Sequence, residues 1–315
     1  MNIQQLKYAL AVEEAKHFEQ AAEKCFVTQS TLSTMIGKLE SELGIKLFDR
    51  KTKPVSVTKE GEKLMNQFRI ILKEIETLET MAQELKGETV GELRIGIIPT
   101  IAPYLLPSFL IPFAKNFPKI KISVREMPTQ DLQQALHQRK LDIGIAAIPL
   151  DDNELIEYPL YTEPFLLYDR NLHSNDQEVS IEDIHLSKLW LLQEGHCMRT
   201  QVKHICNLSS SHFNEVSNLE FKAGSIDSLI RFTRVNQGVT LLPLLAIQEF
   251  EKEELQYCSR FSPPVPVRSV GMIIHKHFVK KKLLKKLQIM IQQSMSKLIE
   301  QTSKEHIVHP LKEEK

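Results

Sequence analysis

The sequence predicts an α/β protein with a helical N-terminal domain, a long connecting helix and two α/β lobes. Three observations predict this order. Three short helix patterns and a basic hairpin fill residues 1–58, an apolar seven-residue repeat follows from Leu64, and strand and helix patterns alternate after Gly91. We therefore divide the chain into residues 1–58, 59–87 and 88–302, with a polar and loose tail at 303–315.

Length and composition limit the class of protein. A chain of 315 residues exceeds a single core, and 40 basic residues balance 40 acidic ones, so any contact with nucleic acid must come from local positive patches. The lack of an apolar leader or membrane-spanning run predicts a soluble, cytoplasmic protein. The 4 cysteines are too few for a secreted disulfide framework, so a disulfide here is expected to be transient or sensory.

The N-terminal domain has the pattern of a helix-turn-helix. One helical face carries Phe18, Ala21, Ala22 and Cys25, with the cysteine expected in the core, and after a break at Val27 and Thr28 a second carries Leu32, Ile36, Leu39 and Leu43. The outer face of the second helix is then left with Gln29, Ser30, Ser33, Thr34 and Lys38. We expect these side chains to meet base edges of double-stranded DNA.

A basic segment follows and is expected to form a wing. Residues 46–59 include Arg50, Lys51 and Lys53, which are suited to contact phosphates beside the groove.

The connecting helix carries a heptad seam. It is expected to begin after Thr58 and to end at Gly87, with apolar residues alternating at steps of four and three: Leu64, Phe68, Ile71, Ile75, Leu78, Ala82 and Leu85. The alternative is a single helix packed on its own domain. We favour a dimer, which suits a palindromic DNA site, and leave homodimer and homotetramer both open.

The region after Gly91 predicts two α/β lobes. The first has the order βαβαβ and hence a parallel sheet: strand 92–98, helix 102–116, strand 121–127, helix 132–139 and strand 141–148. The second set is strand 165–168, strand 189–192, a helix after Ser225 through Arg234 and strand 239–242. Strand 268–275 and helix 280–298 are expected to return to the first lobe. Ligands of such folds bind in the crevice between lobes.

The N-terminal domain contains a long motif: the run from Ala21 to Ser33, followed by Ile36, Leu39, Glu40, Leu43 and Gly44 and then by Leu47 to Arg50. This motif resembles that of the LysR-type transcription regulators. The resemblance covers nearly the whole chain and implies a winged helix-turn-helix, a linker helix and a two-lobed, periplasmic-binding-protein-like regulatory domain. It also implies RNA polymerase as a partner and a protein that is not an enzyme.

Three further runs resemble the peroxide-sensing branch of that family: 96–107, 195–206 and 240–243. The resemblance implies that Cys197 is the cysteine oxidised by hydrogen peroxide and Cys206 its disulfide partner. It implies that Thr100 and Thr129 help bind peroxide with the loop at Gly195 and His196, and that Cys258 is nonessential. Thr200, where an acid is expected, and His204 depart from the pattern and put the reactivity of the thiols in doubt.

The residues around the cysteine pair fit a redox switch. His196 and Arg199 flank Cys197 and are expected to lower its pKa, and Gly195 is expected to open a helix. If Cys197 to Cys206 is helical, nine residues separate the two Cα atoms by roughly 13 Å, whereas a disulfide needs about 4.4–6.8 Å. Such a helix must unwind when the disulfide forms.

Other interpretations stay open. Both thiols are compatible with ordinary buried cysteines. His196, Cys197, His204 and Cys206 offer ligands for zinc or copper, although the spacing is not that of a zinc finger, and we expect no metal or other cofactor. Thr100 and Thr129 also fit helix N-caps. The rival functions are a LysR-type regulator that binds an organic anion between its lobes and a thiol peroxidase, for which a DNA-reading domain has no use.

Overall fold

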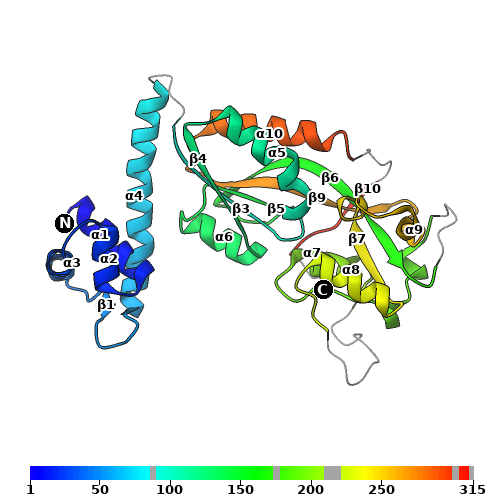
Figure 1. The fold of residues 1–315 in the computed structure, drawn as a ribbon, viewed down its shortest axis with the longest axis horizontal. Coiled ribbons are helices and arrows are strands. Elements are labelled where there is room, and N and C mark those ends of the chain that lie inside the picture. Colours follow the sequence, from blue (N-terminus) through cyan, green and yellow to red (C-terminus); the bar gives the residue numbers. More distant parts are fainter. Residues whose placement is uncertain (86–89, 173–177, 209–220, 300–304, 312–315) are drawn as a thin grey trace. The chain divides into compact units, whose positions relative to one another are not determined.

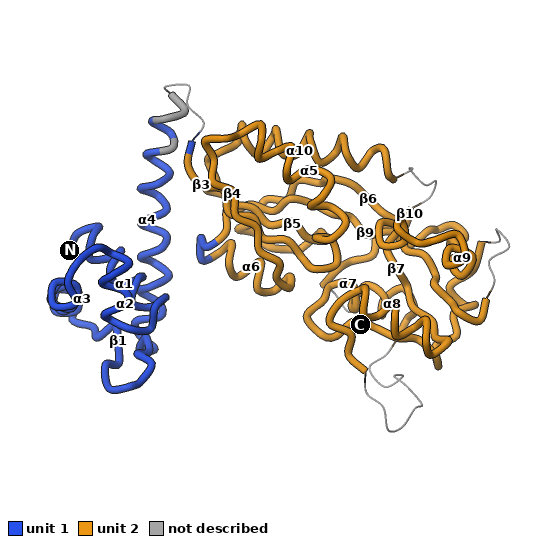
Figure 2. The backbone as a smooth tube through the Cα atoms, in the orientation of Figure 1, with its two compact units in different colours: residues 1–90, 138–140 blue, residues 91–137, 141–315 orange. Residues whose placement is uncertain are grey.

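The structure is a computed structural model that describes residues 1–85, 90–172, 178–208, 221–299 and 305–311 (Figure 1). The chain forms two compact units (Figure 2). One contains residues 1–90 with 138–140, and the other contains 91–137 with 141–315. Among the described residues, no helix has the length and apolar character needed to cross a membrane.

The first unit begins with the predicted helix-turn-helix. Its helices are α1 (Ile3–Ala15), α2 (Phe18–Lys24) and α3 (Gln29–Leu43), and its wing pairs β1 (Phe48–Asp49) antiparallel with β2 (Ser56–Val57). The Thr28 side chain caps α3 by accepting the Thr31 N–H at 3.2 Å. Gly44 ends the helix at a positive φ of 66°, which glycine adopts without steric cost.

Helix α4 (Lys59–Leu85) carries the predicted heptad seam, whose first part is packed in the domain core and whose later part includes exposed residues. Phe68 is buried in the core of the first unit, and Leu64 and Ile71 pack partly against it. For these turns the alternative of a helix packed on its own domain is correct. Farther along, the Leu78 side chain is 68% exposed. The predicted end of the helix at Gly87 lies outside the described residues.

The first lobe of the second unit confirms the predicted βαβαβ order. It contains β3 (Gly91–Ile97), α5 (Ala102–Asn116), β4 (Ile120–Glu126), α6 (Thr129–His137) and β5 (Ile143–Ile148). Strand β3 pairs parallel with both β4 and β5. Helix α10 (Lys281–Met295) packs against α5, so the predicted return of the chain to this lobe is also confirmed.

Two long antiparallel strands carry the sheet from one lobe into the other. They are β6 (Leu155–Asp169) and β9 (Val265–His275), and the strand order is β4-β3-β5-β9-β6-β7. The sequence pattern predicted only residues 165–168 of β6. The part of β6 before Phe165 alternates poorly between apolar and polar residues because Pro159 and Pro164 interrupt it and the register shifts between Pro159 and Tyr161.

The second lobe is built on the far half of β6. Strands β7 (Val239–Pro243) and β8 (Cys258–Arg260) pair antiparallel with it. The lobe also contains three helices, α7 (Cys197–Ile205), α8 (Ile226–Val235) and α9 (Lys252–Leu255). Three 3-10 turns complete it: η1 (Ile181–Asp183), η2 (Leu186–Lys188) and η3 (Leu244–Ile247). Ser225 caps α8 by accepting the Ser228 N–H at 3.1 Å. The strand predicted at 189–192 is wrong, because this apolar run makes only isolated bridges, from Leu189 to Val239 and from Leu192 to Ala223.

The prediction of a loose tail is wrong for residues 305–311. Strand β10 (Glu305–Ile307) pairs parallel with the start of β9, and Val308 is buried. The Gln201 amide on α7 donates to the Val308 carbonyl oxygen at 2.8 Å. Backbone hydrogen bonds, which do not depend on side-chain polarity, hold the segment on β9.

Candidate redox and DNA-binding sites

Helix α7 separates the two candidate redox cysteines. Gly195 has a positive φ of 93°, His196 is the N-cap residue, Cys197 is the first helical residue and Cys206 is the C-cap. All four cysteines are free thiols. The helical rise places the Cα atoms of Cys197 and Cys206 about 13 Å apart, so a disulfide between them requires α7 to unwind.

The two thiols are buried in different cores. Cys197 belongs to the apolar cluster of the first lobe, and Cys206 to the cluster of the second lobe. Burial raises the pKa of Cys206 to about 12, which keeps this thiol protonated at neutral pH. Formation of a disulfide must therefore remove at least one sulfur from its own core.

Burial also raises the pKa of Cys197, and several polar groups oppose that effect. In order of decreasing influence these are the Thr129 hydroxyl, the Arg268 guanidinium and the backbone N–H groups of Met198 and Ala147. The predicted lowering of the pKa is thus wrong for the resting protein, because loss of water around the sulfur outweighs these groups.

A buried ion pair supplies the positive charge near Cys197. Arg268 and Glu163 lie directly opposite each other on β9 and β6, and both side chains are fully buried. The Arg268 Nε donates to Glu163 Oε1 at 2.6 Å, while Leu245 N–H donates to Glu163 Oε2 at 3.2 Å. Arg268 also donates to the Thr100 hydroxyl at 3.3 Å and to the Thr100 carbonyl oxygen at 3.1 Å.

Sequence reasoning missed both members of this pair. The available signal was a single charged residue inside each of two apolar strand patterns, Glu163 in YTEPF and Arg268 in VPVRSV. Isolated charges are almost never fully buried unless they are paired, so each indicated a partner elsewhere in the chain.

The two threonines expected to bind peroxide are both buried. Thr100 does not cap α5, whose N-cap is Ile101, and instead contacts Arg268. Thr129 is the first residue of α6. Its hydroxyl lies near the Cys197 sulfur but makes no well-formed hydrogen bond with a described residue. The Thr129 hydroxyl, which can both donate and accept, is therefore a buried group beside the thiol that can still hydrogen-bond a small polar ligand.

The charged neighbours of Cys197 in sequence act differently from the prediction. Arg199 donates to the Leu192 carbonyl oxygen at 2.8 Å and is not among the groups that lower the pKa of Cys197. Burial lowers the pKa of His196, which favours its neutral form. The cause differs between the two residues: Arg199 projects away from the sulfur at the start of the helix, whereas loss of water around His196 disfavours its charged form.

The alternative metal site also finds no support around α7. Within the described ranges, the only group of three His, Cys, Asp or Glu residues at ligand spacing lies elsewhere, in the first lobe. Cys197 and Cys206 lie at opposite ends of α7, with His196 and His204 beside them.

The candidate DNA-binding residues of α3 and the wing lie at the surface of the first unit. On α3, Gln29, Ser30, Thr34 and Lys38 are exposed and Ser33 is partly exposed, and Lys51 and Lys53 are exposed in the wing. Arg50 donates to the Ser33 hydroxyl at 2.9 Å, and its guanidinium lies 4.8 Å from the centre of the Phe18 ring. Arg50 therefore connects the wing to the helix that carries the candidate base-reading side chains.

Family models match most of the chain. Residues 3–62 match the bacterial regulatory helix-turn-helix protein of the lysR family, and residues 86–296 match the LysR substrate binding domain. The chain belongs to the LysR family of DNA-binding transcription regulators.

Within that family, the chain is similar to proteins named OxyR. The DNA-binding transcriptional dual regulator OxyR of Escherichia coli K12 is 37% identical over 276 residues, which are 87% of this chain and 89% of the relative. A full-length OxyR variant from Pseudomonas aeruginosa has a TM-score of 0.77 at 28% identity and covers 93% of this chain and 98% of its own. A mutant OxyR of Corynebacterium glutamicum with bound H₂O₂ has a TM-score of 0.60 at 25% identity, covering 96% and 98%.

Proposed function

We propose that this LysR-family regulator senses hydrogen peroxide through Cys197 and changes its binding to double-stranded DNA when Cys197 is oxidised. The observation that carries the proposal is the group of polar atoms around the buried sulfur. The Thr129 hydroxyl and the Arg268 guanidinium both favour the thiolate, and Thr129 keeps hydrogen-bonding capacity for peroxide.

The first chemical step is attack of the Cys197 thiolate on one peroxide oxygen. The S–O bond forms as the O–O bond breaks, which gives a sulfenic acid and a hydroxide ion that takes up a proton to become water. Arg268 stabilises the thiolate, and Thr100, Thr129 and the Gly195–His196 loop position the peroxide. Because the resting thiol has a raised pKa, the small thiolate fraction limits this step.

The second step is attack of the Cys206 sulfur on the Cys197 sulfenic acid. An S–S bond forms, the S–O bond breaks and water leaves with the Cys206 proton. This step requires α7 to unwind, because the helix holds the sulfurs in separate cores. The covalent change is thereby coupled to a rearrangement of the regulatory unit.

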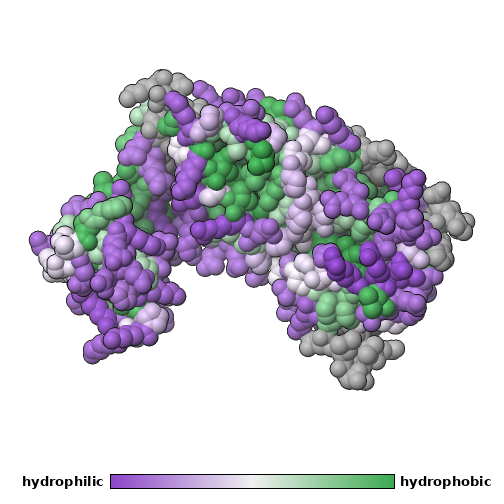
Figure 3. Space-filling model, viewed as in Figure 1, coloured by the Kyte–Doolittle hydropathy of each residue, from purple (hydrophilic) through white to green (hydrophobic). Residues whose placement is uncertain are grey.

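The DNA-binding half of the proposal uses α3 and its wing. The side chains on α3 read base edges, and Arg50, Lys51 and Lys53 contact phosphates. Hydrophobic surface runs along α4 (Figure 3), and its exposed members include Leu78 and Met81. We propose that this part of α4 joins two chains into a homodimer or part of a homotetramer, which acts with RNA polymerase in the cytoplasm and not as an enzyme.

An organic anion between the lobes has less support as the signal. The buried cation that would attract it, Arg268, is already neutralised by Glu163 and hydrogen-bonded to Thr100. An added anion would have to compete with an existing ion pair of short contacts.

The test is brief peroxide treatment of the wild type, Cys197→Ser and Cys206→Ser, followed by mass spectrometry and DNA footprinting. We expect a Cys197–Cys206 disulfide and a changed footprint in the wild type, no response in Cys197→Ser, and sulfenic or higher acids at Cys197 in Cys206→Ser. A footprint that changes equally in Cys197→Ser contradicts the proposal. Sustained catalytic peroxide consumption would instead favour the thiol peroxidase.

A further inference from the structure

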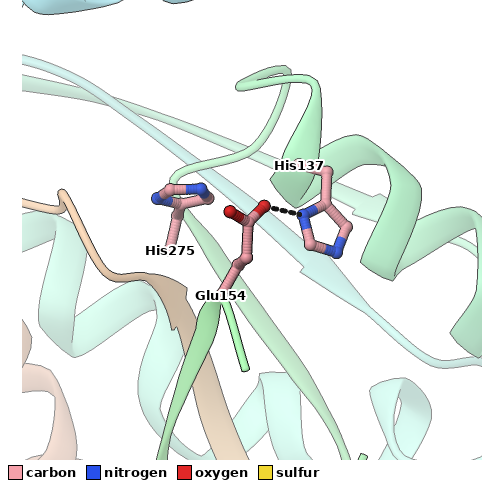
Figure 4. A group of neighbouring side chains, drawn as sticks. All are labelled: His137, Glu154 and His275. Atoms are coloured by element: carbon pink, nitrogen blue, oxygen red, sulfur yellow. Dashed lines mark ion pairs between the residues drawn. The ribbon is translucent and has the colours of Figure 1, made fainter. Parts of the chain in front are cut away.

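A second group of reactive side chains lies in the first lobe, apart from the cysteines. His137 ends α6, Glu154 lies just before β6 and His275 ends β9, and Figure 4 shows the three side chains directed toward one another. One ligand atom from each residue lies within 4.8 Å of the other two. Segments far apart in the sequence therefore place two imidazoles and one carboxylate around a common point.

The geometry of the group suits a metal ion. A tetrahedral ion with bonds of about 2.0–2.1 Å separates its ligand atoms by roughly 3.3 Å. The observed separation of His137 Nδ1 and Glu154 Oε2 is 3.4 Å. Because Glu154 is half-exposed, its carboxylate can adjust toward His275, and solvent can reach a fourth coordination position.

The outer contacts of the group orient two of the candidate ligands. The Asp152 carboxylate lies 2.7 Å from His137 Nε2, so the ring can donate this N–H to Asp152 while Nδ1 binds an ion. This carboxylate–histidine arrangement is common behind metal-bound histidines. Lys276 Nζ lies 3.2 Å from Glu154 Oε1, the oxygen that does not face His137.

One existing contact must be given up. The His277 N–H donates to His275 Nδ1 at 3.2 Å. If the ion binds Nδ1, it takes the lone pair that accepts the His277 N–H. If the ion binds Nε2, the neutral ring carries its proton on Nδ1, which then has no lone pair to accept with. The His277 contact is therefore lost in both cases. A bond to a metal ion offsets the loss of one long hydrogen bond.

We propose that His137, Glu154 and His275 bind a divalent transition-metal ion of the zinc type, held in place by Asp152 and completed by water. Two imidazoles and one carboxylate are ligands that such ions accept, whereas the absence of a thiolate from the set distinguishes it from the cysteines of α7. The site is independent of the peroxide chemistry proposed above.

The experiment is calorimetric titration of reduced, full-length protein with Zn²⁺ in the presence of a competing chelator. We expect one site per chain in the wild type, and affinity at least about 100-fold weaker in Glu154→Gln and in His137→Gln. Asp152→Ala should weaken binding by about 10–100-fold, since it removes the orienting contact and not a ligand. The matched control is His185→Gln, an exposed histidine of the second lobe, which should bind as the wild type does.

Cobalt identifies the ligands without relying on affinity. The Co²⁺ complex of the wild type should lack sulfur-to-metal charge-transfer absorption, and its spectrum should be lost in Glu154→Gln. Glu154 is exposed enough that this variant is expected to fold, and circular dichroism checks it. Unchanged Zn²⁺ affinity in both Glu154→Gln and His137→Gln would overturn the proposal. So would a thiolate spectrum that disappears in Cys197→Ser, because the ion would then reside at the cysteines.

Discussion

Replacement of the buried ion pair separates its structural role from its chemical role. In Arg268→Met the Glu163 carboxylate stays fully buried and loses its cation, keeping the Leu245 N–H as a donor. Breaking a buried pair in this way typically costs about 3–5 kcal/mol of unfolding free energy. The double variant Arg268→Met/Glu163→Leu removes both charges and should recover part of that loss. What remains is about 1 kcal/mol for each lost hydrogen bond to Thr100 and about 1–3 kcal/mol for the Leu245 N–H, which loses its acceptor.

The chemical effect should remain in both variants. Arg268 lowers the pKa of Cys197, so its removal leaves the burial effect less opposed and raises that pKa further. Each additional unit of pKa reduces the thiolate fraction about tenfold at neutral pH, and the oxidation rate falls with it. Urea unfolding measures stability, and the pH dependence of Cys197 alkylation and of peroxide oxidation measures the thiolate. If the double variant has the alkylation profile and oxidation rate of the wild type, Arg268 does not stabilise the thiolate.

Four further predictions test other parts of the molecule. Thr129→Val should slow oxidation of Cys197. Its free energy of unfolding in urea should stay within about 1 kcal/mol of the wild-type value, because the lost hydroxyl has no well-formed hydrogen-bond partner among the described residues. Thr129→Ser should restore the oxidation rate. Leu78→Lys, at a side chain 68% exposed on α4, should give monomers in sedimentation and weaken operator binding, whereas an intact dimer would exclude this part of α4 from the interface. The pKa of Cys206 is raised to about 12, so the native reduced protein holds this proton more strongly than the unfolded chain does. The resulting stability is complete below about pH 9 and should be lost as the pH rises toward 12, by at most about 1.4 kcal/mol per pH unit. The decline should be shallower in Cys206→Ser. Gln201→Leu removes the hydrogen bond from α7 to the Val308 carbonyl oxygen and should speed disulfide formation after oxidation of Cys197. An unchanged rate would mean that residues 305–311 do not stabilise α7 against unwinding.

The elements that sequence patterns predicted are those with strong local periodicity. Helix α5 spans Ala102–Asn116, the predicted range, and the parallel pairing of β3 with β4 and β5 follows from the βαβ order. The pattern was weaker where prolines interrupt β6 and where a polar segment forms β10 by backbone pairing. The apolar run 189–192 is buried without being a strand, since burial alone does not distinguish a strand from an irregular segment.

Local sequence alone therefore determined the helix-turn-helix, the exposed polar face of α3, the order of the first lobe and the position of both cysteines at the ends of one helix. Only the tertiary structure decided which groups surround Cys197. Arg199, two residues away, points to the Leu192 carbonyl, whereas Arg268 acts on the sulfur. Arg268 and Glu163 are 105 residues apart and meet because β6 and β9 pair in one register. A helix is specified by neighbours three and four residues away, but the field at a buried thiol is set by whichever charges packing brings near it.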